Sequence, residues 1–395
     1  MDILFLAHRA PYPPDRGDKI RSHHVLCHLA AQARVHLIAF ADDAADQVVP
    51  HDLAAALASA TIVPRRKPRA LALIEALATG RPVSLAAFDA VAMRRAVRDL
   101  LDRHPIDAIY AFSGQMAQYL PSGGARVVMD FVDVDSAKFA GYAAEGPVPA
   151  RWMMRREARL LGGFEREVAA RADASLFVSA AEAALFRKGG GTGRIVAIEN
   201  GIDAAYYDPA RIVPVAADGP LLLFTGQMDY RPNVEAVCWF ARDVLPLIHA
   251  THPDAIFTIV GRAPTAAVRA LASDRIRVTG AVDDVRPWLA AASVCVAPLQ
   301  LARGIQNKVL EAMAMARAIV ASPAAAEGID HVGTIRIGAD ATGFAQAVTG
   351  LLDRPGDAAA QGRLARMQVM ARYTWPARLA PLDALLALPD GRAAA

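Results

Sequence analysis

Residues 298–314 read PLQLARGIQNKVLEAMA, and this stretch decides how the rest of the chain is interpreted. An apolar run at 294–297 precedes it and predicts a strand, while its second half has the apolar spacing of a helix. A loop that ends at a helix N-terminus presents free backbone N–H groups and the positive end of the helix dipole. The stretch therefore predicts an α/β unit that can hold a phosphate group at its strand-to-helix turn.

The side chains of this stretch add charge around the predicted turn. Gly304 permits a close backbone approach, and Arg303 and Lys308 supply two positive charges. Lysine is scarce elsewhere, since only five of the 43 basic residues are lysines. Glu311 lies three residues after Lys308, so both fall on about the same helix face. A carboxylate there suits the ribose diol of a nucleotide; the alternative is an ordinary capped helix with an i,i+3 ion pair.

Strands and helices alternate along the whole chain, which predicts parallel sheets covered by helices. The predicted strands lie at 3–7, 35–40, 108–111, 126–130, 175–178, 195–198, 221–225, 256–260, 276–278, 294–297, 318–321 and 334–337. The stretch 204–220 is rich in proline and glycine and is typical of a linker. We therefore predict an α/β protein with two Rossmann-like, doubly wound domains, at 1–205 and 206–373, that face a cleft.

Composition limits the class of protein. The chain has 43 Lys and Arg against 40 Asp and Glu, and a formal charge of +3 argues against a general nucleic-acid binder. Neither a signal peptide nor an uncharged run of about 20 residues is present, so we expect a cytoplasmic protein, at most peripheral at the inner membrane face. The basic stretches 65–69 and 151–156 suit anionic headgroups; a solvated loop and a solvated helix face are the alternative.

Two other motifs have competing interpretations. The glycines at 189–193 look like a dinucleotide loop, but they follow a helix and precede a strand, which favours a flexible turn. Asp133 and Asp135 follow a strand that closes at Asp130, and such a pair can hold a divalent metal. The metal-dependent sugar transferases with this pair have one compact domain, so two domains disfavour metal. Asp133 is then expected at the carboxyl edge of a sheet in a polar or catalytic role, with helix capping by Asp135 as the alternative.

Residues 308–322, KVLEAMAMARAIVAS, resemble the signature of retaining glycosyltransferases of family 4, the glycosyl transferases group 1. Other segments that resemble this family are Asn200–Asp203, Ser179–Glu182, Phe224–Asn233 and His8–Arg21. The combination of the N-terminal segment 8–21 with DFVDVDS at 130–136, GQMDYRPN at 226–233 and ARGIQNKVLEAMA at 302–314 looks closest to sugar transferases associated with exosortase and exopolysaccharide gene clusters. The resemblance implies the GT-B fold, with C-terminal helices at 374–390 that pack back on the first domain.

The resemblance also implies a reaction and its site. A sugar moves from a nucleoside diphosphate sugar, the co-substrate, to a hydroxyl of a lipid-linked or other glycan acceptor, with retention and without metal or cofactor. The implied catalytic residues are Asp133, Arg303 and Lys308; the donor-binding residues are Gly17, Gly226, Arg231, Gly261, Gly304, Ile305, Gln306, Asn307 and Glu311; the acceptor-side residues are Arg16, Lys19 and Arg21.

Three positions depart from the family pattern. Arg303 stands where the family usually has a glutamate that contacts the sugar, and Asp133 stands about where it has a histidine. Arg231 is the only cation in its loop. An epimerase or phosphorylase of the same fold, or a non-catalytic nucleotide-sugar-binding partner, therefore remains an alternative. An oxidoreductase is disfavoured, because no GxGxxG motif opens a helix after a strand.

Overall fold

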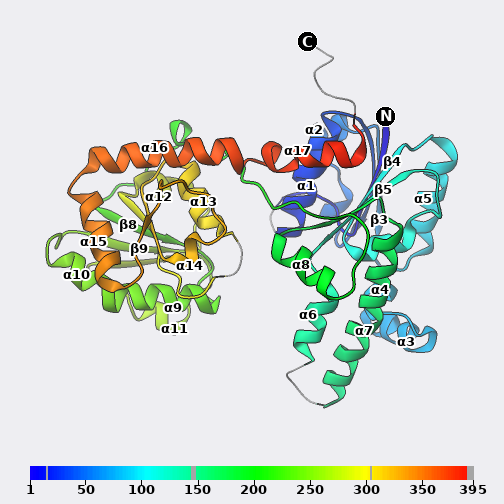
Figure 1. Cartoon of the computed structure of the whole chain (residues 1–395), viewed down its shortest axis with the longest axis horizontal. Coiled ribbons are helices and arrows are strands. Elements are labelled where there is room, and N and C mark those ends of the chain that lie inside the picture. The colour runs from blue at the N-terminus through cyan, green and yellow to red at the C-terminus, as the bar shows by residue number, and fades with distance from the viewer. Residues whose placement is uncertain (15–16, 144–147, 303–304, 389–395) are drawn as a thin grey trace, which may run out of the picture. The chain divides into compact units, whose positions relative to one another are not determined.

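The computed structural model describes residues 1–14, 17–143, 148–302 and 305–388. The chain forms two compact units (Figure 1). Unit 1 comprises Met1–Asn200 and the chain from Arg378 on, and unit 2 comprises Gly201–Ala377. These limits differ by a few residues from the predicted domains 1–205 and 206–373.

Unit 1 contains a seven-stranded sheet in the order β3-β2-β1-β4-β5-β6-β7, and every neighbouring pair is parallel. The strands are β1 (Asp2–Ala7), β2 (Arg34–Ala41), β3 (Ser59–Pro64), β4 (Ala108–Phe112), β5 (Arg126–Val132), β6 (Ala174–Phe177) and β7 (Ile195–Ala197). The central strands β1 and β4 are buried almost throughout, as expected for a parallel sheet covered on both faces. The sequence missed β3, because this edge strand is largely exposed and lacks a continuous apolar run.

The helices of unit 1 connect these strands. They are α1 (Gly17–Ala30), α2 (His51–Ala56), α3 (Arg69–Thr79), α4 (Val83–Ala87), α5 (Val91–Arg103), α6 (Asp135–Tyr142), α7 (Val148–Arg171) and α8 (Ala180–Lys188). The side chain of Ser179 accepts a hydrogen bond from the Glu182 N–H and so caps α8. The last helix, α17 (Trp375–Leu386), contacts α1 through Asp383, whose carboxylate lies 2.7 Å from His28 Nε2.

Unit 2 contains a six-stranded parallel sheet in the order β10-β9-β8-β11-β12-β13. The strands are β8 (Leu221–Thr225), β9 (Ile256–Val260), β10 (Ile276–Gly280), β11 (Val294–Ala297), β12 (Ile319–Ala321) and β13 (Arg336–Ile337). Each of them overlaps a predicted strand. The chain of unit 2 therefore follows the predicted alternation closely, because its strands are short, apolar and separated by helices.

The helices of unit 2 lie on both sides of its sheet, with α9 and α11 on one side and α16 on the other (Figure 1). They are α9 (Arg231–Trp239), α10 (Leu245–His249), α11 (Ala266–Arg269), α12 (Arg286–Ala291), α13 (Asn307–Ala314), α14 (Pro323–Ala326), α15 (Ala341–Leu352) and α16 (Pro355–Arg372). A π-helical turn, Phe240–Val244, joins α9 to α10. Across the described part of both units, no helix has the length and apolar composition needed to cross a bilayer.

Candidate functional site

A pocket of about 740 Å³ opens in unit 2 where the strands β8, β9 and β10 end and α13 begins. Its described lining residues are Thr225, Gly226, Gln227, Tyr230, Asn233, Val260, Gly261, Arg262, Ala281, Val282, Val285, Ile305, Gln306, Asn307, Lys308 and Glu311. Parallel α/β sheets bind ligands outside the carboxyl ends of their strands, and this volume is within the range of small-molecule sites. We call this cavity the donor pocket. It brings together six of the nine predicted donor-binding residues.

Two glycines shape the floor of the donor pocket. A Cβ at Gly261 would lie 1.6 Å from the backbone oxygen of Gly226, so the two chain segments approach too closely for any side chain. Gly226 itself has a φ of +155°, and a Cβ there would lie 2.8 Å from Asn233 Nδ2 and 3.4 Å from Lys308 Nζ. Both glycines are therefore required by packing and also leave room beside Lys308.

Lys308 projects from the first turn of α13 into this pocket. Its Nζ donates a hydrogen bond to Asn233 Oδ1 at 2.5 Å and lies 4.5 Å from the centre of the Phe224 ring. Desolvation lowers the pKa of Lys308 to about 8, against the opposing effect of the Glu311 carboxylate. The amine thus has a neutral amide and an aromatic face as its nearest partners, and an incoming anion would gain a strong, poorly hydrated contact.

Glu311 lies one turn along α13 and also lines the pocket. Burial raises the pKa of its carboxyl group, while a hydrogen bond from the Tyr207 hydroxyl and the charge of Lys308 act in the opposite direction. The i,i+3 ion pair with Lys308 that an ordinary helix would show is not among the ion pairs of the described residues. The carboxylate is instead held by Tyr207, a residue of the segment between the two sheets.

The N-terminus of α13 completes the polar side of the pocket. Ile305, Gln306 and Asn307 all line it, and among the described residues no side-chain hydrogen bond caps the helix at Gln306. The first backbone N–H groups of a helix lack intrahelical partners and attract anions. Arg303 and Gly304, which the sequence also assigns to this turn, lie outside the described residues.

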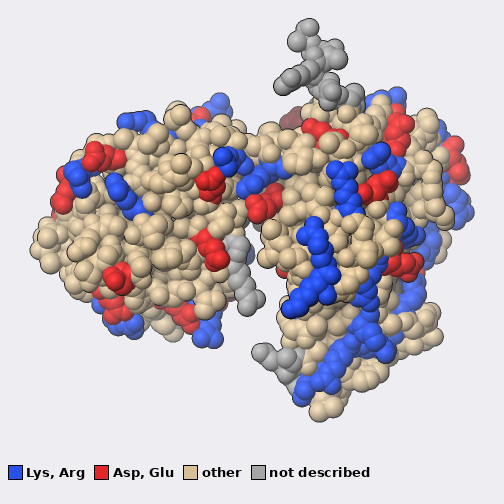
Figure 2. All heavy atoms as spheres, in the orientation of Figure 1, with Lys and Arg blue, Asp and Glu red and all other residues tan. Residues whose placement is uncertain are grey.

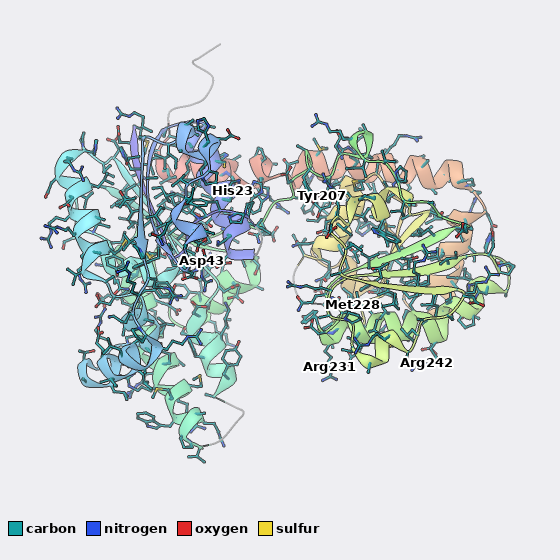
Figure 3. The ribbon with its side chains drawn as sticks, turned by 180° about the vertical axis from the view of Figure 1, so that it is seen from behind. His23, Asp43, Tyr207, Met228, Arg231 and Arg242 are labelled. Atoms are coloured by element: carbon teal, nitrogen blue, oxygen red, sulfur yellow. The ribbon has the colours of Figure 1, made fainter. Side chains whose placement is uncertain are left out.

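The cation predicted in the β8 loop is not in the pocket. Arg231 is exposed, forms an ion pair with Glu235 at 2.7 Å and points outward from the start of α9 (Figure 3). Arg262 lines the pocket instead, and its Nη2 donates to Gln227 Oε1 at 3.0 Å. Sequence reasoning named Gly261 but missed Arg262, although a cation directly after a strand-ending glycine was the available signal.

Two predicted acceptor-side residues have structural roles in unit 1. Lys19 Nζ lies 2.6 Å from the Asp46 carboxylate, and both side chains are buried. Arg21 is 1% exposed, pairs with Asp130 at 2.8 Å and donates to the Ile198 carbonyl. Burial and pairing give Lys19 and Arg21 roles in holding unit 1 together, and their assignment to an acceptor surface stays a prediction. Arg16, the third residue, lies outside the described residues.

Gly17 is the first residue of α1, and a Cβ there would meet no atom within 4 Å. Packing among the described residues therefore does not require glycine at this position. Its predicted role in approaching a donor phosphate or an acceptor stays a prediction.

Asp133 follows β5 and keeps a half-buried carboxylate near the sheet edge. Lys138 Nζ lies 2.8 Å from Asp133 and 3.1 Å from Asp135, so a lysine bridges the two carboxylates. Asp130 lies in the core, where it accepts hydrogen bonds from Arg21 and Tyr110. A bridging ammonium group occupies the position between the two carboxylates where a bound cation would be expected.

His8, just beyond β1, is a polar residue that the sequence did not single out. It is 9% exposed, its Nε2 lies 3.4 Å from Asp18, and Nδ1 has no hydrogen-bond partner among the described residues. Burial lowers the pKa of His8, although Asp18 acts in the opposite direction. A neutral, buried imidazole at the carboxyl end of a central strand is suited to accept a proton or a hydrogen bond. It stands inside the segment His8–Arg21 that carries part of the family resemblance.

Comparisons with known proteins agree with this architecture. Residues 219–354 match the family model of the glycosyl transferases group 1. The sucrose-phosphate synthase of Thermosynechococcus elongatus aligns at 18% identity and a TM-score of 0.64 over 98% of both chains. Anabaena HepE in complex with UDP aligns at 14% identity and a TM-score of 0.64, over 98% of this chain and 100% of HepE. WaaG, a glycosyltransferase involved in lipopolysaccharide biosynthesis, aligns at 15% identity and a TM-score of 0.62, over 97% and 99%. No curated protein matches the chain in sequence.

At these identities the solved structures establish the fold, and the family match falls on the unit that carries the donor pocket. The chain therefore has the GT-B fold, and residues 219–354 of its second unit match the family model of the glycosyl transferases group 1.

Proposed function

We propose that this protein transfers a sugar from a nucleoside diphosphate sugar to an acceptor hydroxyl, with retention of the anomeric configuration. The observation that carries the proposal is the donor pocket, where Lys308, the open N-terminus of α13 and Glu311 line one cavity. HepE, a protein of similar fold, has been crystallised with UDP and with UDP-glucose. A uridine nucleotide is accordingly the first donor to test.

The pocket offers a group of suitable chemistry for each part of such a donor. The diphosphate would lie at the α13 N-terminus, between the cations of Lys308 and Arg262. The ribose diol would donate hydrogen bonds to the Glu311 carboxylate in competition with the Tyr207 hydroxyl. The base would face the apolar side chains of Ala281, Val282 and Val285.

The chemistry follows from where charge develops. As the bond from the sugar to the diphosphate breaks, negative charge grows on the leaving group and positive charge on the sugar ring. Lys308 and the helix N-terminus would stabilise the leaving group, and such fixed electrostatics is usually the largest catalytic contribution. We assign the same role to Arg303. A donor phosphate oxygen takes the acceptor proton, so the reaction needs no dedicated side-chain base. The family resemblance implies that it needs neither a metal nor a cofactor.

On the acceptor side we propose Asp133, whose carboxylate would orient the acceptor hydroxyl after exchanging its contact with Lys138. The proposed acceptor is a lipid-linked glycan, and the proposed role is exopolysaccharide or glycolipid biosynthesis at the cytoplasmic face of the inner membrane. The support for this role is the resemblance of four segments of the chain to transferases of that kind.

A donor screen tests the proposal. Thermal shift with UDP, GDP and their sugars should identify one base that stabilises the protein, and the identified donor should then label a lipid-linked acceptor. The anomeric configuration of the product, read by NMR, should equal that of the donor, and EDTA should leave the rate unchanged. Inversion would overturn retention, and dependence on added Mg²⁺ would overturn metal independence. Epimerised donor in the absence of acceptor would indicate an epimerase instead of a transferase. Turnover that depends on phosphate would indicate a phosphorylase, and binding without any turnover would indicate a non-catalytic nucleotide-sugar-binding partner.

A further inference from the structure

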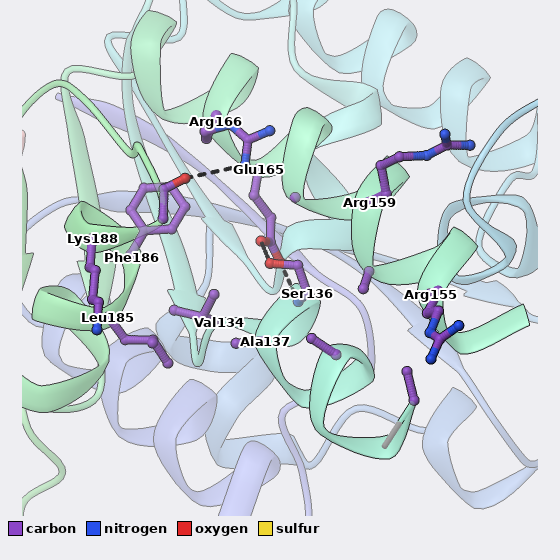
Figure 4. Close-up of a pocket in the computed structure, with 15 residues that line it drawn as sticks. Val134, Ser136, Ala137, Arg155, Arg159, Glu165, Arg166, Leu185, Phe186 and Lys188 are labelled. Atoms are coloured by element: carbon purple, nitrogen blue, oxygen red, sulfur yellow. Dashed lines mark hydrogen bonds between the residues drawn. The ribbon is translucent and has the colours of Figure 1, made fainter. Parts of the chain in front are cut away.

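A second pocket, of about 780 Å³, lies within unit 1 between α6, α7 and α8 (Figure 4). Its described lining residues are Val134, Ser136, Ala137, Ala140, Ala143, Arg155, Ala158, Arg159, Gly162, Glu165, Arg166, Leu185, Phe186, Lys188 and Gly189. We call this cavity the α7 groove. Most of its lining is apolar, and none of its residues lines the donor pocket.

The groove exists because small side chains line it. Gly162 of α7 packs directly on α6, where a Cβ would lie 3.3 Å from the Cβ of Ser136. Farther along, Ala137, Ala140 and Ala158 fill too little space to close the gap between the two helices. Leu185 and Phe186 of α8 form the opposite wall (Figure 4). An apolar channel open to water is costly for a folded protein unless a ligand covers it.

Basic side chains border this apolar channel. Arg155, Arg159 and Arg166 lie on one face of α7, since they are separated by four and seven residues, and Lys188 comes from α8. All four are exposed, and Lys and Arg side chains form a stripe along α7 (Figure 2). Arg155, Arg159 and Lys188 have no ion pair with any residue in the described part of the chain. Their charge is therefore available to a ligand.

The one acidic residue of the described lining does not cancel this charge. Glu165 is buried, and its carboxylate accepts hydrogen bonds from the Ser136 N–H at 3.1 Å and from the Ser136 hydroxyl at 2.5 Å. Its two oxygens are thus directed at α6 rather than at the arginine stripe (Figure 4).

Apolar groups continue on the same helix face beyond the arginines. Trp152 and Val148 precede Arg155 by three and seven residues, and they are 57% and 76% exposed. With a rise of 1.5 Å per residue, Val148 lies about 10 Å along the helix from Arg155. An exposed tryptophan next to cations is the composition of a protein surface that meets the boundary between lipid chains and headgroups.

We propose that the α7 groove binds a lipid phosphate, with the phosphate on Arg155, Arg159 and Lys188 and the hydrocarbon chain along the alanine-lined channel. A soluble sugar phosphate would leave the channel uncovered, and a neutral lipid would leave the cations unpaired. Only an anionic amphiphile satisfies both parts of the groove. The inference goes beyond the proposed function, because it concerns unit 1 alone and holds whether or not unit 2 binds a nucleotide sugar.

Titration calorimetry of the full chain with decyl phosphate, below its micellar concentration, tests this proposal. Decyl maltoside and inorganic phosphate serve as the uncharged amphiphile and the chain-free anion. We expect decyl phosphate to bind at least tenfold more tightly than either. Equal binding of inorganic phosphate would indicate a simple anion site, and equal binding of decyl maltoside would indicate an apolar groove; either result overturns the proposal.

Variants localise the binding. Arg155→Ala/Arg159→Ala removes two exposed cations and should weaken decyl phosphate at least tenfold, while Ala140→Trp should weaken it by filling the channel without changing the charge. The matched control is Arg95→Ala/Arg98→Ala, which removes the same charge from exposed positions of α5. Circular dichroism checks that each variant folds. Unchanged affinity in both groove variants, or an equal loss in the control, places the lipid elsewhere and overturns the proposal.

Discussion

The donor pocket and the α7 groove have nearly equal volumes, about 740 and 780 Å³, yet they hold their positive charge differently. Lys308 is half-buried and donates a hydrogen bond to the Asn233 side chain, whereas Arg155 and Arg159 are exposed to solvent at the border of an apolar channel. A desolvated cation attracts an anion strongly, while an exposed one is screened by water and salt. The first arrangement suits precise binding of a small, highly charged ligand. The second suits an amphiphile whose affinity comes largely from its chain.

The largest effect is expected at Glu311. Glu311→Ala removes the carboxylate assigned to the ribose and should abolish transfer, while the fold is retained. Steady-state rates with the identified donor measure transfer, and a thermal melt of the free protein measures whether the fold is retained. Glu311→Gln, which keeps the shape and one acceptor oxygen, is the matched variant and should retain part of the donor affinity. Full transfer by Glu311→Ala would refute the ribose assignment.

Lys308→Met should slow transfer and yet stabilise the free protein. The loss of one preorganised charge costs about 2–4 kcal/mol in the barrier. Folding lowers the pKa of Lys308 from 10.5 to about 8, so stability that is present above pH 10.5 is lost as the pH falls through about 8. At pH 7 the Lys308→Met variant has no buried ammonium group to desolvate, so its free energy of unfolding should rise by about 1–3 kcal/mol. Urea unfolding at pH 7 and pH 10 measures the gain, which should shrink at the higher pH; a destabilised variant at pH 7 would contradict this account.

Glu165→Gln should change how stability depends on pH. Burial raises the pKa of Glu165 from 4.5 to about 7. The contribution of this group to the free energy of unfolding is therefore fully present below pH 4.5 and is lost as the pH rises through about 7. This change in the pKa of Glu165 corresponds to at most about 3 kcal/mol in the free energy of unfolding. Glutamine keeps the contacts to Ser136 without the charge. Unfolding curves of both proteins from pH 5 to pH 8 should therefore diverge, with the variant gaining at pH 8; parallel curves would show that Glu165 does not titrate in this range.

The smallest effect distinguishes two arginines of unit 2. Arg262→Ala should weaken donor binding by about 1–2 kcal/mol, because Arg262 lines the donor pocket. Arg231→Ala should leave donor binding nearly unchanged, because that side chain is exposed and paired with Glu235. Calorimetry with the nucleoside diphosphate compares the two variants. An equal loss in both would mean that the pocket walls differ from those described.

Much of the donor pocket was accessible from the sequence because its parts are local. Lys308 and Glu311 share one helix, and Gly226 and Gly261 directly follow apolar strands. The family resemblance implied both glycines. Arg262 directly follows Gly261 but was overlooked.

The surroundings of Lys19 and Arg21 could not be predicted, because their partners are distant in the chain. Lys19 and Arg21 lie in a motif that resembles a ligand-binding loop, but Asp46 and Asp130 hold their charges inside unit 1. Asp130 is 109 residues away from Arg21. No local pattern identifies such a pairing, because ion pairs form between side chains that the completed sheet brings together.

The sequence by itself determined the alternation of strands and helices, the two parallel sheets and the charged turn before α13, since these depend on apolar periodicity and local chemistry. Tertiary structure alone decided which charges are free. It buried Lys19 and Arg21 and placed Asn233 rather than Glu311 against Lys308. It also formed the α7 groove, which three separate helices line. The physical reason is that burial and long-range pairing, unlike periodicity, are properties of the assembled fold.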